Sequence, residues 1–282
     1  MSESSRIITL TTDFGIRDTY VGIMKGVILG INLNVQVVDL THAIPPQDIY
    51  EAAFSINAAH SYFPRGTIHV IVVDPGVGSD RRAIVCQTDN AFFVCPDNGV
   101  LSYLLQSTED EAEQPINAVE IQNKAYYLPE VSNTFHGRDI FAPVAAHLSL
   151  GVPLEDIGPP VQTLVQLPIQ APELSGNTLT GQIVKIDRFG NAITNISESA
   201  IAGLESASTG GISAYEIRIG SVRLNRFNRA YAESGVGKPL AIIGSSGLLE
   251  IAVNGGSAEK QLGLKRGDVI VIRKVDKSCQ EI

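Results

Sequence analysis

Apolar and polar positions follow two different periods along the first half of the chain. Short apolar runs indicate buried strands, and the stretches between them repeat apolar side chains every three or four residues, which indicates amphipathic helices. The predicted strands are 7–12, 35–40, 67–73, 82–89 and 92–95, and the predicted helices are 20–31, 48–62 and one that follows Asp139. This alternation predicts an α/β domain with a mostly parallel sheet and flanking helices. Ligands of such sheets bind beyond the carboxyl ends of the strands, where we expect the site.

The pattern changes in the second half of the chain. Residues 158–176 are rich in proline and have no helical period, which predicts a linker between two domains. Beyond the linker, short β-like runs are separated by glycine-containing turns, and they are 181–187, 215–224, 240–243, 249–253 and 269–273. That spacing is typical of a small β-barrel or sandwich. We expect an α/β domain over residues 1–165 and a smaller, all-β, barrel-like domain over residues 166–282.

Composition narrows the function classes. The 282 residues carry 21 Lys and Arg against 30 Asp and Glu, which argues against a nucleic-acid partner because phosphate neutralisation needs clustered basic side chains. No apolar stretch approaches the ~18–20 residues of a membrane span, and the polar N-terminus lacks a signal peptide's apolar region. We therefore expect a cytoplasmic protein with no membrane partner. The cysteines Cys86, Cys95 and Cys279 have no C-x-x-C spacing and predict neither a disulfide framework nor a zinc site.

Two clusters of charged residues follow predicted strands of the first domain. Asp13 and Asp18 stand at a strand-to-helix turn, where a carboxylate either accepts the hydroxyl protons of a ribose or caps the helix. The second cluster begins with Asp74 at the end of an apolar strand and continues through a Pro-Gly turn to Arg81 and Arg82. A carboxylate in that position is costly unless it is paired, and either arginine is a suitable partner.

Three further clusters lie later in the chain, and each also has an ordinary structural explanation. His136 stands in residues 132–139 at the start of a predicted helix, although a lone histidine is more often structural. Residues 187–195 and 244–254 place small polar side chains beside glycines, which let a backbone approach a ligand closely but also form common turns. None of the 5 histidines pairs with another His or Cys at metal-ligand spacing, so we expect no metal site.

Taken together and in this order, the clusters resemble the S-adenosyl-L-methionine (SAM) hydroxide adenosyltransferase family, which is related to the SAM-dependent fluorinases and chlorinases. The resemblance extends from about Ile7 to Val271. Its most specific segments are TTDFGIRDTYVGIMKGVI, VVDPGVGSDRR, CPDNGVLS, SNTFHGRDIFAP, DRFGNAITNI and GSSGLLEIAVN. It implies an N-terminal α/β domain and a C-terminal β-barrel. It also implies homotrimers, with each site between the N-terminal domain of one subunit and the C-terminal domain of its neighbour.

The resemblance assigns the chemistry to three residues. Hydrolytic members of the family are marked by an Asp–Arg–His set, which falls here on Asp74, Arg81 and His136. The halogenases lack this set and carry an extra loop, for which this chain has no room between Arg81 and Cys95. Both departures indicate that the nucleophile is water and not a halide.

The resemblance also implies how the substrate is held. Asp13 is expected to bind the ribose hydroxyls, Asn191 the adenine, and Asp187 the methionine amino group. The halogenases have an arginine at the position of Ser246, so the substrate carboxylate must be recognised differently here. The remaining expected binding residues, which face the amino group, the adenine or the methionyl end, are Asp18, Phe189, Tyr231, Ser245, Ser246, Glu250 and Val253.

These inferences predict hydrolysis of SAM to adenosine and L-methionine, with attack of water or hydroxide at the ribose C5′ carbon. No general acid is needed because the sulfonium leaves as a neutral thioether, and we expect neither a cofactor nor a metal. Arg81 is expected to stabilise hydroxide-like charge on the water, and either Asp74 or His136 to take its proton. The alternatives are a non-catalytic adenosine or SAM sensor and a SAM-dependent halogenase.

Overall fold

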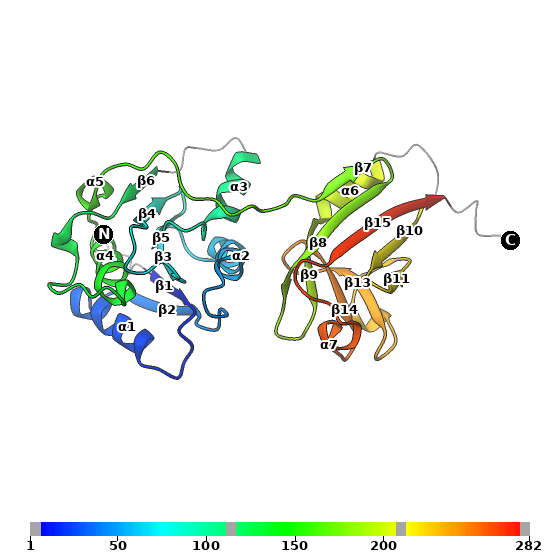
Figure 1. Ribbon diagram of the computed structural model, residues 1–282, viewed down its shortest axis with the longest axis horizontal. Coiled ribbons are helices and arrows are strands. Elements are labelled where there is room, and N and C mark those ends of the chain that lie inside the picture. Colours follow the sequence, from blue (N-terminus) through cyan, green and yellow to red (C-terminus); the bar gives the residue numbers. More distant parts are fainter. Residues whose placement is uncertain (1–6, 111–116, 207–212, 277–282) are drawn as a thin grey trace. The chain divides into compact units, whose positions relative to one another are not determined.

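The computed structural model describes residues 7–110, 117–206 and 213–276 of the chain. The chain divides into two compact units, Met1–Ile169 and Gln170–Ile282, each built around its own buried apolar residues (Figure 1). Cys86 and Cys95 are buried free thiols of the N-terminal unit, whereas Cys279 lies outside the described residues.

The N-terminal unit contains a mixed six-stranded sheet in the order β2-β1-β3-β5-β4-β6. Its strands are β1 (Ile7–Thr12), β2 (Gln36–Thr41), β3 (Thr67–Val72), β4 (Ala83–Gln87), β5 (Ala91–Pro96) and β6 (Asn117–Glu120). Strands β2, β1, β3 and β5 run parallel to one another, but β4 pairs antiparallel with both β5 and β6. The expected parallel arrangement therefore covers only part of the sheet. The turn between β4 and β5 is too short for the crossover that a parallel pair requires.

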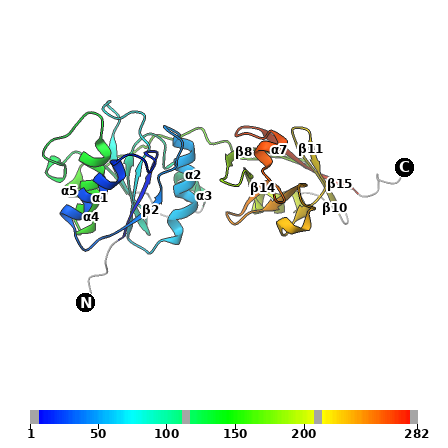
Figure 2. The same ribbon diagram turned by 90° about the horizontal axis from the view of Figure 1, so that it is seen from below.

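Helices cover both faces of this sheet (Figure 2). They are α1 (Tyr20–Ile31), α2 (Ile49–Ala59), α3 (Ser102–Asp110), α4 (Ala142–Ser149) and α5 (Leu154–Ile157), with short 3-10 turns at η1 (His60–Tyr62) and η2 (Lys124–Tyr126). Along β3, Val70 and Val72 share a core with α1 and α4, whereas Ile71 belongs to the core formed with α2 and α3. Successive side chains of a strand point to opposite faces, and because this sheet is covered on both sides, all six residues of β3 are buried.

The C-terminal unit is built on a nine-stranded sheet. Its path runs β11-β10-β15-β8-β9-β14-β13-β12, with β7 added beside β8, and all pairs are antiparallel except β12 with β13. The strands are β7 (Glu173–Ser175), β8 (Thr178–Ile186), β9 (Ala192–Ser197), β10 (Ser213–Ile219), β11 (Val222–Leu224), β12 (Phe227–Asn228), β13 (Pro239–Ile243), β14 (Leu248–Val253) and β15 (Val269–Asp276).

This sheet curls around one main core. Ile217 of β10 and Ala241 of β13 come from near opposite ends of the strand order, yet both belong to one buried cluster with Ile183 and Ile251. A second, small cluster consists of Leu240, Ile242 and Ala252. Three short helical segments accompany the strands, namely α6 (Glu198–Ser206), η4 (Tyr231–Glu233) and α7 (Ala258–Leu262). The unit is therefore β-rich, as expected, but it is not all-β.

Candidate functional site

The carboxyl ends of β1 and β3 meet at one edge of the N-terminal sheet. The strands are parallel neighbours with Thr12 opposite Val72, so Asp13 and Asp74 follow them at the same edge. A pocket of about 370 Å³ lies there and contains three predicted site residues, Asp13, Asp74 and His136. The other lining residues are Phe14, Tyr20, Pro46, Gln47, Val72, Pro75, Val77, Thr134, Phe135 and Gly137.

Asp74, Arg81 and His136 are joined through one guanidinium group. Nε of Arg81 lies 3.0 Å from each carboxylate oxygen of Asp74, and Nη2 also donates to Oδ2. The same Nη2 lies 2.8 Å from Nδ1 of His136. The side chains of Asp74 and Arg81 are only 5% and 11% exposed, and the guanidinium carbon lies 5.2 Å from the ring centre of Phe141. The three predicted catalytic residues thus form one hydrogen-bonded set, in which Asp74 and Arg81 are largely shielded from water and His136 is partly buried.

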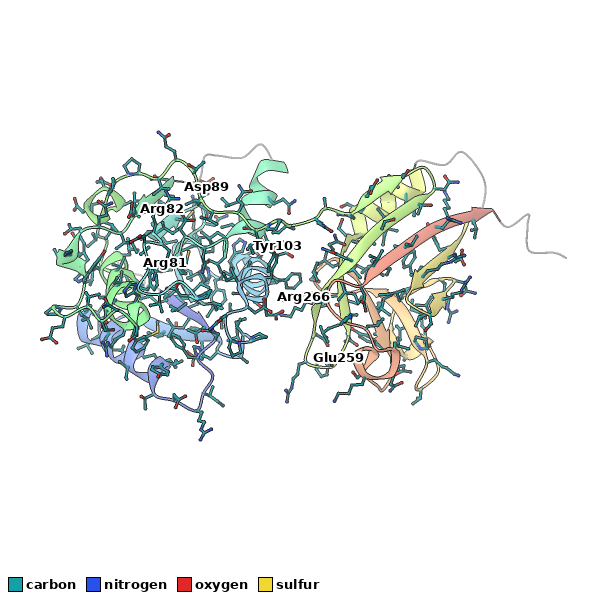
Figure 3. The ribbon with its side chains drawn as sticks, in the orientation of Figure 1. Arg81, Arg82, Asp89, Tyr103, Glu259 and Arg266 are labelled. Atoms are coloured by element: carbon teal, nitrogen blue, oxygen red, sulfur yellow. The ribbon has the colours of Figure 1, made fainter. Side chains whose placement is uncertain are left out.

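Arg82, the other candidate partner of Asp74, pairs with Asp97. Figure 3 labels both arginines, Arg81 and Arg82, in the N-terminal unit. Its Nε donates to Oδ2 of Asp97 at 2.9 Å, and its Nη2 donates to the carbonyl of Thr163. Oδ1 of Asp97 accepts a bond from the backbone N–H of Val165, and Ser102 Oγ accepts one from Leu167. This second ion pair therefore fastens the chain that follows α5 to the N-terminal unit.

His136 is neutral in this arrangement. Burial lowers the pKa of its imidazole and the Arg81 guanidinium lowers it further, while Asp74 and Asp139 offset part of the effect. Because a guanidinium can only donate hydrogen bonds, Nδ1 of His136 is the acceptor from Arg81. The neutral ring then carries its single proton on Nε2.

The loop that carries His136 is held by a buried carboxylate. Oδ2 of Asp139 accepts hydrogen bonds from both the backbone N–H and the hydroxyl of Ser132, each at 2.8 Å, and Arg138 donates to both carboxylate oxygens. Burial raises the pKa of Asp139, but these bonds outweigh it and the pKa is lowered. His136 itself immediately precedes a π-helical turn, η3 (Gly137–Phe141), a conformation that is frequent at functional sites.

The structure separates the two carboxylates of the first sequence cluster. Asp13 lines the pocket, and its Oδ2 accepts a hydrogen bond of 2.8 Å from the backbone N–H of Gln47. Asp18 is exposed and is not among the residues that line this pocket.

Sequence reasoning missed an aromatic wall of this pocket. The rings of Phe14, Tyr20 and Phe135 lie with their centres 5.1–5.7 Å apart, in tilted and edge-to-face contacts. Phe14 follows Asp13 and Phe135 precedes His136 in the sequence. This adjacency to predicted site residues was the signal from which the two rings could have been predicted to line the pocket. Such contacts favour an apolar or π-bearing ligand surface.

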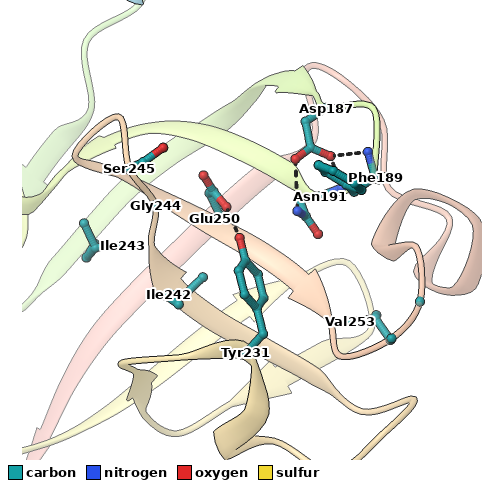
Figure 4. A pocket seen from close by; sticks show the side chains of 12 residues that line it. Asp187, Phe189, Asn191, Tyr231, Ile242, Ile243, Gly244, Ser245, Glu250 and Val253 are labelled. Atoms are coloured by element: carbon teal, nitrogen blue, oxygen red, sulfur yellow. Dashed lines mark hydrogen bonds between the residues drawn. The ribbon is translucent and has the colours of Figure 1, made fainter.

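A larger pocket, of about 820 Å³, lies in the C-terminal unit (Figure 4). It brings together residues that are far apart in sequence, from the β8–β9 turn, η4, β13, the β13–β14 turn, β14 and the turn after β14. Seven of the predicted binding residues line it, and they are Asp187, Phe189, Asn191, Tyr231, Ser245, Glu250 and Val253. Ser246 is not among its lining residues.

Asp187 organises one side of this pocket. Its Oδ1 accepts hydrogen bonds from the backbone N–H groups of Phe189 and Asn191, and its Oδ2 accepts one of 3.0 Å from Nδ2 of Asn191. The carboxylate thus holds its own turn and fixes the orientation of the Asn191 carboxamide. The Phe189 ring is left 78% exposed.

Glu250 and Tyr231 form the opposite side (Figure 4). The Tyr231 hydroxyl donates to Oε2 of Glu250 at 3.0 Å. Burial raises the pKa of Glu250, the bond from Tyr231 lowers it, and the charge of Asp187 raises it again, with a net increase. Burial and Glu250 raise the pKa of Tyr231 to about 12. Gly244 packs so closely on Glu250 that a Cβ atom there would overlap with the carboxylate.

The described residues contain no group of three or more His, Cys, Asp or Glu side chains that is arranged to hold a metal ion. His69 has a structural position in the core: it is fully buried, its ring stacks on Phe93, and its Nδ1 lies 2.7 Å from the hydroxyl of Thr9. None of the helices in the described part of the chain is both long and apolar enough to cross a membrane.

Comparisons with known proteins match both units. Residues 8–158 match the SAM hydroxide adenosyltransferase N-terminal domain, and residues 181–271 match the C-terminal domain of the same family. An (R)-S-adenosyl-L-methionine hydrolase from Thermus thermophilus is 40% identical, with 93% of this chain and 97% of the relative covered. A fluorinase from Actinoplanes is 28% identical, with 95% and 97% covered.

Solved structures agree with these matches. A crystal structure of an uncharacterised conserved protein from Thermotoga maritima superimposes with a TM-score of 0.85 at 36% identity, over 94% of this chain and 99% of that protein. The two domain matches together span most of the chain and occur in the order of the family. This protein therefore belongs to the SAM hydroxide adenosyltransferase family.

Proposed function

We propose that this protein hydrolyses SAM to adenosine and L-methionine, and that it acts on the (R) sulfonium epimer. The observation that carries the proposal is the hydrogen-bonded set of Asp74, Arg81 and His136 beside a pocket that also contains Asp13. Relatives named (R)-S-adenosyl-L-methionine hydrolase, at 36–40% identity, support both the reaction and the epimer.

Activation of the nucleophile is the main chemical task. A C5′–O bond forms while the C5′–S bond breaks, and the sulfur keeps the electron pair and leaves as the neutral thioether of methionine. The attacking water loses one proton, but its pKa of ~15.7 makes that loss difficult at neutral pH. A shielded guanidinium beside the attacking oxygen stabilises the charge that develops there. Arg81 has this role.

Hydrogen-bond directions support Asp74 as the proton acceptor. Nδ1 of His136 accepts from Arg81, so the Nε2–H group of the neutral ring is a donor and cannot take a proton from water. It is suited to orient the water oxygen. Each carboxylate oxygen of Asp74 can accept more than one hydrogen bond, so a lone pair remains beside the bonds from Arg81. Asp74 is therefore the group that takes the proton.

The two pockets divide substrate recognition. In the N-terminal unit, Asp13 accepts hydrogen bonds from the ribose hydroxyls. In the C-terminal unit, Asn191 and the backbone at Val253 bind adenine, and Asp187 and Glu250 face the positively charged end of the substrate. Two carboxylates in one pocket produce a negative potential that attracts a cation. The pKa of Glu250 is raised mainly by burial, and the negative charge of Asp187 raises it further.

The family resemblance supports a trimer as the functional assembly. In this arrangement the N-terminal unit of one copy and the C-terminal unit of another supply the two parts of each site. No cofactor is required, because the positively charged sulfur already makes C5′ reactive.

The test compares two neighbouring arginines. Arg81→Ala removes the proposed charge stabiliser, whereas Arg82→Ala removes an ion pair of the same type outside the pocket. With (R)-SAM as substrate, we expect Arg81→Ala to lower kcat by about 10²–10³-fold and to weaken adenosine binding by less than about threefold. Arg82→Ala should keep wild-type kcat once its folded fraction is matched.

Chromatography of adenosine and methionine gives turnover for both sulfonium epimers, and calorimetry gives adenosine affinity. Equal losses of turnover and affinity in Arg81→Ala would indicate a binding role for the arginine. Tight binding of both epimers without turnover by the wild-type protein would replace the hydrolase by a sensor.

A further inference from the structure

The turn that precedes α2 contains a backbone conformation that is rare for its residue type. The backbone N–H of Asp48 bonds to the carbonyl of Pro45 at 3.0 Å, which closes a four-residue turn with Gln47 in the third position. Gln47 has a φ of +65°, and it alone among the described non-glycine residues has a positive φ. Proline in the second position and a positive φ in the third are the pattern of a type II turn.

Glycine would fill this position with less strain. Side chains of L-residues crowd the backbone at positive φ, which is why type II turns prefer Gly or Asn in the third position. The chain uses glycine at the 13 other positive-φ positions among the described residues. No described residue forms a hydrogen bond with the Gln47 carboxamide, so protein contacts do not explain why a glutamine stands here.

The strained turn lies at the pocket of the N-terminal unit. Gln47 lines the pocket together with Asp13, Asp74 and His136. Its backbone N–H donates to Oδ2 of Asp13 at 2.8 Å, so the turn fixes the Asp13 carboxylate, and Gln47 is an exposed residue of the same pocket. Strained residues that persist at a pocket are a basis for inferring a function.

We propose that Gln47 is a substrate-positioning residue that donates a hydrogen bond from Nε2 to a ribose hydroxyl oxygen next to Asp13. The inference rests on the proposed function, because it takes the ribose from there. Its chemistry is complementary to that of Asp13. An ionised carboxylate can only accept hydrogen bonds, so the ribose hydroxyls donate to Asp13. Each hydroxyl oxygen can then still accept a hydrogen bond from another group. A carboxamide supplies that donor without adding charge.

The test separates strain from binding with two substitutions. Gln47→Gly removes both the carboxamide and the strain, whereas Gln47→Leu removes the carboxamide and keeps a side chain of similar length. We expect Gln47→Gly to raise Tm by about 2–4 °C and Gln47→Leu to leave Tm nearly unchanged. Both variants should weaken adenosine binding by about 3- to 10-fold, the effect of one lost hydrogen bond.

Deoxynucleosides identify the partner atom. Binding of adenosine, 2′-deoxyadenosine and 3′-deoxyadenosine is measured by calorimetry for the wild-type protein and both variants. For one of the two deoxynucleosides, the loss of the Gln47 carboxamide should change affinity by less than about twofold, because the hydroxyl that it contacts is already missing.

Two results would overturn the inference. The first is wild-type adenosine affinity in both variants, which would show that the Gln47 carboxamide does not contribute to adenosine binding. The second is an equal loss for all three nucleosides, which would indicate a general distortion of the pocket. The assay needs no turnover, so a wild-type protein that binds adenosine but does not hydrolyse SAM would refute the proposed function and still test Gln47. A wild-type protein that does not bind adenosine would refute both.

Discussion

His136 depends on its neighbour Arg81 for its protonation state. The shared hydrogen bond requires a lone pair on Nδ1 of His136. Protonation of Nδ1 would place two N–H donors face to face at 2.8 Å and would put a second positive charge beside Arg81. Burial and Arg81 lower the pKa of this histidine below its ordinary value of 6.5. The ring is therefore neutral at pH 7, and acidification through the lowered pKa breaks the set.

The expected consequence is an acid limb in the pH profile of kcat/KM, with a midpoint below pH 6.5. His136→Asn provides an acceptor close to the position of Nδ1 but does not titrate, so this limb should be absent from its profile. Proton NMR gives a second measure, because the His136 resonance, assigned by its loss in the variant, should titrate below pH 6.5. An unchanged acid limb in His136→Asn would assign it to another group.

Some of these residue contacts were predictable from the sequence and others were not. An aspartate at the end of an apolar strand needs a cation, which limited the partner of Asp74 to two adjacent arginines. Their side chains diverge, so Arg81 bonds to Asp74 and Arg82 to Asp97, and only the fold decides between them. The positive φ of Gln47 has no sequence signal, since Pro-Gln in a turn does not specify the sign of φ.

The loop before α4 shows how an element places a side chain. Asp139 is fully buried, and it ties the N–H and hydroxyl of Ser132 to the first turn that follows His136. The pocket residues between these two points, Thr134 to His136, therefore have both ends of their loop fixed.

Asp139→Asn should lower kcat by about 10- to 100-fold, because a catalytic group that is displaced by ~1 Å loses activity on that scale. An asparagine would turn an N–H group toward the donors of Arg138 or Ser132, so Tm should also fall. Arg138→Ala is the matched control, since it removes the ion pair of Asp139 but leaves both hydrogen bonds to Ser132 in place. Steady-state kinetics and thermal unfolding measure both effects. Wild-type kcat in Asp139→Asn would show that the loop does not need this anchor.

Elements with a strong apolar period were predictable, and polar elements were not. Strands β1 to β5 and helices α1 and α2 lie within a few residues of their predicted ranges, whereas the short strand β6 was not predicted. Helix α3 was not predicted because its sequence, SYLLQSTED, has one short apolar run and is otherwise polar. The antiparallel strand β4 looks like its parallel neighbours in sequence, because burial on both faces gives the same apolar run in either direction.

At the scale of the whole molecule, the predicted residues divide between two pockets in different units. The change of pattern near residues 158–176 predicted two domains, but neither period nor composition could indicate that each would carry a pocket. The expectation of a homotrimer came from the family resemblance alone, because the pattern of exposed side chains does not predict the symmetry of an assembly.

A complementation experiment tests the proposed trimer. Arg81→Ala impairs the N-terminal pocket and Asn191→Ala the C-terminal pocket, so each homotrimer should have little activity. Coexpressed chains should recover about a quarter of wild-type activity if one copy supplies each part of a site in a closed ring. Native mass spectrometry checks that mixed trimers form. Mixed trimers without recovered activity would place both parts of a site in the same chain.

The Asp97 contacts determine where this protein can be recombined with its relatives. The N-terminal family match ends at residue 158, but Arg82, Asp97 and Ser102 bind the chain at Thr163, Val165 and Leu167, and the compact unit continues to Ile169. A chimera joined at residue 158 would therefore replace this fastening segment with a foreign one. A junction after Ile169 exchanges the C-terminal unit and keeps the segment with the side chains that hold it.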